Sequence, residues 1–209
     1  MKERNKMTKL NNPSREEWLQ AAVRELQADV FTPAALQIPA DVKVSCGWPS
    51  SGGVRSSKGM TIGQCFSRSC SKANINEIFI SPTQNDSVKV LDVLAHELIH
   101  AIDDCQNGHK APFKRMALAI GLEGKMTSTT AGEALKALLQ AIVKRLGDYP
   151  HEELDISNRK KQTTRMMKVE CSDISCGFSF RTSRKQIAEI DFSKGCLSKG
   201  CNGDLRIVQ

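Results

Sequence analysis

Two histidines and a glutamate in the middle of the chain have the spacing of a catalytic metal site. They are His96, Glu97 and His100, in the order His-Glu-Leu-Ile-His. On an α-helix, residues four positions apart lie one turn apart on the same face, so both imidazoles can bind one zinc ion. Glu97 then lies beside a water molecule on that ion and can act as a general base. The pattern predicts the chemistry of a zinc metalloprotease.

A catalytic zinc site needs a third protein ligand and one open position. We expect that ligand to come from outside the helix, because a helix rises ~1.5 Å per residue and three successive turns cannot reach one ion. His109 follows Gly108, where the chain can reverse, and is the first candidate, with Glu123 as the alternative. Asp103 or Asp104 could accept a hydrogen bond from one of the ligand histidines.

Four cysteines near the C-terminus predict a second metal site with a structural role. They form two pairs, each with a four-residue spacer: Cys171 with Cys176, and Cys196 with Cys201. Four thiolates can bind one tetrahedral zinc ion and leave no position open for chemistry. A module of about 43 residues buries little apolar surface, so we expect metal binding to supply much of its folding free energy.

The other four cysteines are Cys46, Cys65, Cys70 and Cys105. The first three lie near one another in the sequence, but no fourth metal ligand is evident there. Cys65, in a predicted strand, and Cys105, near a helix end, are expected to be buried thiols. The N-terminal residues lack the apolar segment of a secretory signal, so a reducing cytoplasm is expected, in a bacterium or in the host cell of a phage.

Hydrophobic spacing and capping residues predict the elements that position these groups. We expect helices over residues 15–28, 112–120 and 130–147, and strands over 41–48, 60–66 and 76–81. A further, central helix should begin after Asn85-Asp86-Ser87 and run past Ile102, with Asp103 and Asp104 continuing the same face and Gly108 at or after its end. The last helix would start at a capping box of Thr130 and Glu133. Helices segregated from a small sheet predict an α+β fold. The strand of residues 77–81, if it is an edge strand, can bind an extended peptide through its main chain.

Composition predicts two domains, residues 1–150 and 167–209, joined by a polar linker over 151–166. Residues 158–209 hold 11 Lys and Arg but only 5 Asp and Glu, so they carry +6 of the total net charge of +7. Clustered positive charge favours a polyanion, and above all DNA, as a partner. Phe178 and Phe180 can stack on unpaired bases or form the small core of the module. No apolar segment approaches the ~20 residues of a membrane-spanning helix.

Three segments together resemble the SprT-like metalloprotease family, which includes the Spartan proteases that digest proteins crosslinked to DNA. They are His96 to His100, the run Gly-His-Lys-Ala-Pro-Phe over 108–113, and Ala-Ile-Gly over 119–121. The resemblance implies a zincin-like protease core in residues 1–150 and a β zinc ribbon in 167–209. It also implies His96, His100 and His109 as ligands of a catalytic zinc ion and Glu97 as the catalytic base. Lys110 departs from the family, which commonly has Gly there.

The sequence therefore predicts a zinc-dependent endopeptidase that acts on DNA-associated or DNA-crosslinked proteins and is recruited by its basic zinc ribbon. Two Zn²⁺ ions are expected, one catalytic and one structural. The alternative is a non-proteolytic factor of transcription or replication that uses the zincin fold as a scaffold for nucleic-acid partners. The intact Glu97 favours the enzyme, because a scaffold has no need of a general base.

Overall fold

A computed structural model divides the chain into two compact units, Met1–Ser157 and Asn158–Gln209. The structure describes residues 13–50, 60–158 and 166–208. The first part of the expected linker is attached to the first unit, because the Leu154 amide donates to the Pro82 carbonyl at 2.8 Å. Residues 159–165, the basic remainder of that linker, lie outside the described part of the chain. Each unit is therefore described by itself.

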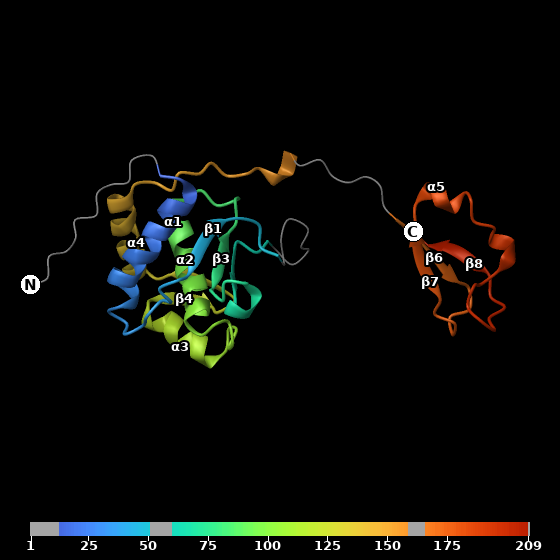
Figure 1. Ribbon diagram of the computed structural model, residues 1–209, viewed down its shortest axis with the longest axis horizontal. Coiled ribbons are helices and arrows are strands. Elements are labelled where there is room, and N and C mark those ends of the chain that lie inside the picture. The colour runs from blue at the N-terminus through green and yellow to red at the C-terminus, as the bar shows by residue number, and fades with distance from the viewer. Residues whose placement is uncertain (1–12, 51–59, 159–165, 209) are drawn as a thin grey trace, which may run out of the picture. The chain divides into compact units, whose positions relative to one another are not determined.

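The first unit contains a three-stranded sheet in the order β1-β3-β2, which Figure 1 shows beside the helices. β1 (Lys43–Cys46) is parallel to β3 (Glu77–Ile80), and β2 (Gly63–Phe66) is antiparallel to β3. Residues 77–81 could be an edge strand or an ordinary inner strand, and the structure shows an inner strand, since β3 hydrogen-bonds to a neighbour on each side. The free edge next to the central helix belongs to β2.

Four helices complete the α+β arrangement of the first unit: α1 (Arg15–Leu26), α2 (Ser87–Ile102), α3 (Ala111–Ala119) and α4 (Glu133–Leu146). Helix α2 packs against the three other helices and against strands β2 and β3. Its apolar residues are fully buried, among them Leu91, Leu94, Leu98 and Ile99. A helix enclosed by packing on several sides is held firmly, so residues on α2 have fixed positions.

The structure contains the capping box predicted at the start of α1 but not the one predicted at Thr130. The predicted capping box at α1 is present, because the Ser14 hydroxyl accepts from the Glu17 amide and the Glu17 carboxylate accepts from the Ser14 amide. The box predicted at Thr130 is wrong. Thr130 lies in β5 (Ser128–Ala131), which pairs with β4 (Leu122–Lys125), and α4 begins only after Gly132, without a side-chain cap. Pairing in this hairpin keeps Thr130 extended and delays the helix.

The second unit is a three-stranded antiparallel sheet in the order β7-β6-β8. Its strands are β6 (Met167–Cys171), β7 (Ser179–Thr182) and β8 (Leu205–Val208), and a one-turn helix, α5 (Arg184–Ile187), follows β7. Among its described residues, the buried apolar side chains are Val169, Cys171 and Leu205. So small a core contributes little folding free energy by itself.

Across both units, none of the helices in the described part of the chain is both long enough and apolar enough to cross a membrane.

Candidate metal centres

Three histidines meet at one point of the first unit. His96 and His100 project from consecutive turns of α2, and His109 comes from the turn before α3. The Nε2 atom of His109 lies 3.2 Å from the Nε2 atoms of both His96 and His100. Three nitrogen atoms of this kind, so close together, could hold one metal ion. The structure thus brings together the three histidines that the sequence singled out.

Burial keeps these imidazoles neutral. It lowers the pKa of His96 to about 3, with a further contribution from the neighbouring His100 and His109. Burial likewise lowers the pKa of His100 to about 4 and shifts that of His109 below its usual value. A neutral imidazole has a free lone pair, so at neutral pH all three rings are in the form that binds metal.

Two neighbours hold the histidine rings in place. The His96 Nδ1 atom lies 2.8 Å from the hydroxyl of Thr129, a buried residue of β5. When Nδ1 carries the proton and donates to this hydroxyl, the lone pair is left on Nε2, which faces the cluster. The ring of Phe113, fully buried on α3, lies 4.8, 4.5 and 5.0 Å from the centroids of His96, His100 and His109. Both contacts preorganise the site.

The other acidic residues considered at sequence level do not join the cluster. Glu123 on β4 is exposed and lies over Gly132, and it is not part of the metal-binding group. α2 ends at Ile102, so Asp103 and Asp104 leave the helix face. Asp104 accepts hydrogen bonds from the Arg68 amide and the Asn76 side chain rather than from a histidine. The buried Asp103 oxygens have no hydrogen-bond partner among the described residues.

Glu97 is buried on α2 under the edge strand β2. Burial raises the pKa of its carboxyl to about 8, against a smaller opposing effect of the backbone N–H of Cys65, which donates to it. At Gly63 the strand comes so near that a Cβ atom would lie 2.7 Å from Glu97 Oε1 and 2.5 Å from Val93 Cγ1. Because only glycine has no Cβ atom, only glycine at position 63 lets β2 pack this closely over the Glu97 carboxyl.

A cavity of about 560 Å³ opens beside His96 and Glu97. One wall is the segment that leads into β2, residues 60–63, and the opposite wall is the β4–β5 hairpin, residues 125–130. Lys89 and Asp92 of α2 also line it and form an ion pair at 2.7 Å. The histidine cluster is therefore reached from a cleft large enough for a segment of another molecule.

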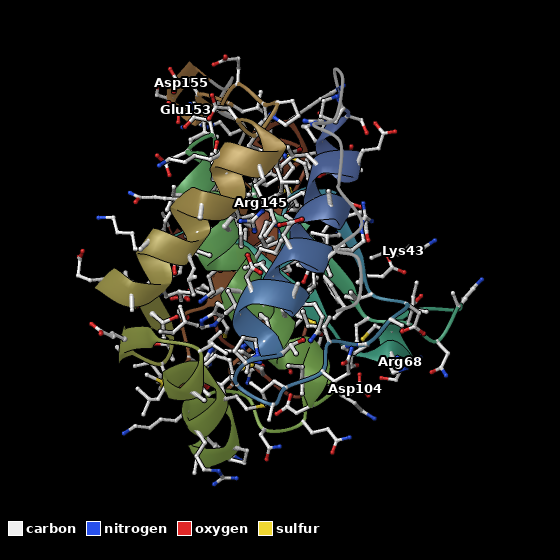
Figure 2. The ribbon with its side chains drawn as sticks, turned by 90° about the vertical axis from the view of Figure 1, so that its left-hand side faces the viewer. Lys43, Arg68, Asp104, Arg145, Glu153 and Asp155 are labelled. Carbon is white, nitrogen blue, oxygen red and sulfur yellow. The ribbon has the colours of Figure 1, made fainter. Side chains whose placement is uncertain are left out.

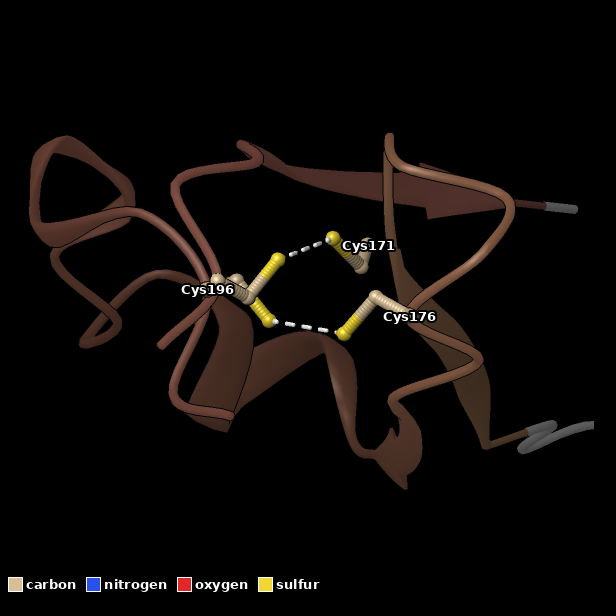
Figure 3. A group of neighbouring side chains, drawn as sticks. Cys171, Cys176 and Cys196 are labelled. Atoms are coloured by element: carbon tan, nitrogen blue, oxygen red, sulfur yellow. Dashed lines mark hydrogen bonds between the residues drawn. The ribbon is translucent and has the colours of Figure 1, made fainter. Parts of the chain in front are cut away.

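The four C-terminal cysteines gather in the second unit, as Figure 3 shows. The Sγ atoms of Cys171 and Cys201 are 3.6 Å apart, and those of Cys176 and Cys196 are 3.7 Å apart. Backbone N–H groups donate to three of these sulfur atoms at 3.4 Å: those of Asp173 to Cys171, Ser198 to Cys196 and Gly203 to Cys201. Such donors stabilise thiolates, the form that binds metal.

The remaining cysteines belong to no metal cluster within the described residues. Cys70 is exposed, and Cys46 accepts a weak hydrogen bond from the Arg15 guanidinium at 3.7 Å. Cys65 and Cys105 are half-buried, and their thiols donate to the Phe66 and Cys65 carbonyl oxygens at 3.7 and 3.6 Å. Their mutual interaction raises the pKa of Cys65, with burial as the second cause, and lowers the pKa of Cys105.

No protein-family model, curated protein or solved structure matches the chain.

Proposed function

We propose that the protein is a zinc-dependent endopeptidase with a zincin-like core, of the SprT-like type that its sequence resembles. Its main support is the convergence of three Nε2 atoms beside a buried carboxyl at the wall of a cleft. Two nitrogens each 2.0–2.1 Å from one tetrahedral zinc ion lie about 3.3 Å apart, close to the 3.2 Å of the histidine cluster. When bound there, zinc supplies Lewis-acid activation of a water molecule and of the scissile carbonyl.

Glu97 is the proposed general base. Its carboxyl ionises when the adjacent histidines hold a cation, because a nearby positive charge favours the carboxylate. The carboxylate then takes a proton from the attacking water and gives it to the leaving amine. The Cys65 backbone N–H orients this carboxylate, and Thr129 and Phe113 orient the histidines. All proton transfers are thus assigned to one residue with a fixed position.

An extended peptide is the substrate form that the cleft favours. β2 is one of the two edge strands of the sheet in the described part of the chain, β1 being the other, and the residues that lead into β2 line the cleft beside Glu97. A peptide added to this edge would be held by main-chain hydrogen bonds, which are the same for every sequence. The peptide-binding role expected for residues 77–81 therefore passes to β2.

We further propose that the second unit is a zinc ribbon that recruits the enzyme to DNA and to proteins bound or crosslinked to it. Four sulfurs 2.3 Å from one tetrahedral zinc ion lie about 3.8 Å apart, near the 3.6 and 3.7 Å of this cluster. The strand register places Arg181 opposite Lys168, and Arg206 opposite Glu170. Lys168 and Arg206 are both ion-paired with Glu170, at 2.7 and 2.8 Å, whereas the exposed Arg181 can replace a counterion along a phosphate backbone.

The protease proposal is tested with purified full-length protein loaded with zinc, an unfolded protein such as reduced casein, and a DNA-bound basic protein. Glu97→Gln should lower kcat/KM by about 10²–10⁴-fold, the usual contribution of a general base, while zinc content stays equal. Glu123→Gln, an exposed carboxyl outside the cluster, is the matched control and should cleave normally. Full cleavage by Glu97→Gln would refute the mechanism. A zinc-loaded wild type that cleaves neither protein would favour the scaffold alternative.

The DNA proposal is tested by titrating DNA binding against salt. Replacing Arg181 and Lys185, two exposed cations of the ribbon, with Gln should weaken binding of the full chain. It should also lower the slope of log affinity against log salt by about one for each phosphate that is no longer neutralised. Glu189→Gln, an exposed anion near them, should leave the slope unchanged. Equal slopes in all three proteins would exclude recruitment by this surface.

A further inference from the structure

A pair of thiols lies beside the histidine cluster without belonging to it. Cys65 is in β2, and Cys105 is in the turn between α2 and α3, forty positions later in the chain. The Cys105 thiol donates to the Cys65 carbonyl oxygen at 3.6 Å, and the Cys65 thiol donates to the Phe66 carbonyl oxygen at 3.7 Å. The two thiols lie near enough to shift the pKa of each other. Both are free and half-buried, so a small reagent can reach them. Neither side chain has a role in the proposed mechanism.

Each of the two cysteines belongs to a segment that holds one part of the site. The backbone N–H of Cys65 donates to the Glu97 carboxyl. The backbone N–H of Cys105 donates to the His100 carbonyl at 2.8 Å, and the turn that contains Cys105 continues to His109. A covalent bond between the two sulfurs would therefore tie the strand over the base to the turn that carries the third histidine.

This turn has an uncommon backbone. Asp104 and Cys105 have φ angles of 52° and 61°, in the left-handed region that few residues other than glycine adopt. The Asp104 carboxylate holds the turn there by accepting from the Arg68 amide at 2.7 Å, and Figure 2 shows these two residues close together. Such conformations persist only where the surroundings enforce them, and they cluster at functional sites. A change at Cys105 can thus shift the whole turn.

We propose that Cys65 and Cys105 are a hydroperoxide-sensitive thiol pair whose disulfide lowers the activity of the neighbouring site. One sulfur attacks the O–O bond of hydrogen peroxide, which forms a sulfenic acid and releases water. The second sulfur then displaces the sulfenic oxygen as water, and the S–S bond forms. Two thiols and one peroxide give one disulfide and two waters. A dithiol reverses the reaction. The effect on activity rests on the proposed function, but formation of the bond does not.

The expected loss of activity follows from the geometry of a disulfide. Both cysteines are free thiols in this structure, and a disulfide holds its sulfurs ~2.05 Å apart, so bond formation draws β2 and the turn together. A displacement on the order of 1 Å at a catalytic group can cost about 10²-fold in rate. Because the turn leads to His109, its displacement should also change how fast the histidine cluster exchanges its metal.

The test treats reduced, zinc-loaded, full-length protein with hydrogen peroxide and then maps its disulfides by mass spectrometry of a non-reducing digest. Wild type should give a linked peptide pair with Cys65 and Cys105, lighter by two hydrogens, and should lose about 10–100-fold in peptidase activity until dithiothreitol is added. Cys70→Ser, which removes the exposed thiol of the neighbouring loop, should behave like wild type. Cys105→Ser and Cys65→Ser should form no link, and the activity that each has before treatment, whatever its level, should not fall further in peroxide.

Several results would overturn the proposal. They are the absence of the Cys65–Cys105 link, a link that changes neither activity nor zinc exchange, and an equal loss of activity in Cys105→Ser, which would locate the damage elsewhere. Failure of the proposed function is recognised separately, since the reduced wild type would then lack peptidase activity. In that case the link and the rate at which a chromogenic chelator takes zinc from the histidine cluster still test the thiol pair.

Discussion

In both the histidine cluster and the cysteine cluster the ligand atoms lie within 4.8 Å of one another, but different forces bring them together. His96 and His100 stand on a helix that is packed on several sides, and their positions follow from the hydrophobic core. The cysteines stand at the ends of strands and in turns of a unit with three buried apolar side chains among its described residues. In the first unit, packing of the helices positions the histidines that could hold a metal ion. In the second unit, we expect metal binding to supply much of the free energy of folding.

Access separates the two clusters as well. The histidine cluster offers three ligand atoms and borders a cleft of about 560 Å³. The cysteine cluster offers four sulfurs, enough to complete a tetrahedral shell without solvent. A site with three protein ligands and one open coordination position suits catalysis. A site with four protein ligands has no open position and suits a structural role.

The largest effect is expected from metal removal. Cys176→Ser should unfold the second unit, because structural zinc supplies about 10–16 kcal/mol of binding free energy in comparable small modules. His109→Ala should abolish zinc binding at the first site and leave the first unit folded. Amide hydrogen exchange of each full-length variant, read separately for the two units, measures both outcomes. A second unit that stays protected in Cys176→Ser would contradict the contrast.

A smaller effect is expected when the support of one histidine is removed. Thr129→Val keeps the shape of the side chain but loses the hydroxyl that contacts His96 Nδ1 at 2.8 Å. Zinc affinity at the histidine cluster should fall about 10–100-fold, the usual cost of losing such a partner. Competition with a chromogenic chelator measures this affinity. Thr129→Ser retains the hydroxyl and should bind zinc nearly as well as wild type. Equal losses in both variants would indicate a packing role instead.

The smallest expected effect is the release of a single proton. Glu97 has a pKa of about 8, so in the metal-free site it holds its proton at pH 7. A bound cation lowers that pKa, and about one proton should leave as zinc binds. At pH 9 the carboxyl is already ionised and the release should vanish. His96 and His100, with pKa values of about 3 and about 4, carry no proton to lose at pH 7.

Calorimetry at pH 7, in two buffers with different heats of ionisation, measures this release once the cysteine cluster is already loaded. Glu97→Gln is the control and should release about one proton fewer than wild type. The same release in both proteins would show that Glu97 is ionised before the metal arrives.

The sequence was most informative where one helix carries the pattern. His96 and His100 are four positions apart and therefore lie on the same face of any α-helix. The apolar residues around them predict that this helix is buried. α2 is present where this pattern predicts it, over Ser87–Ile102, but it ends well before Gly108, so the expectation that Asp103 and Asp104 continue its face is wrong. The α+β arrangement also agrees with the sequence analysis, because clear helix and strand periods alternate with turn residues.

The same reasoning could not predict which segments far apart in the sequence pair with each other. The β4–β5 hairpin was missed, because Leu122–Lys125 contains a single large apolar residue and two charges, and so Thr129 was missed as the partner of His96. The order β1-β3-β2 places β3 in the centre, a fact about pairing that no single strand encodes. Cys65 and Cys105 were expected to be separate buried thiols, since forty residues separate them in the sequence.

Gly63 limits how β2 can assemble on the sheet. A slip by one residue would bring Ile62 or Gln64 over Glu97, where even a single added carbon collides. Misregistered chains therefore cannot close over the carboxyl, and correct strand pairing becomes a condition for assembling the site. Variation among substrates must then be accommodated mainly by the hairpin residues that also line the cleft, Lys125, Thr127, Ser128 and Thr130, since Thr129 is needed to orient His96.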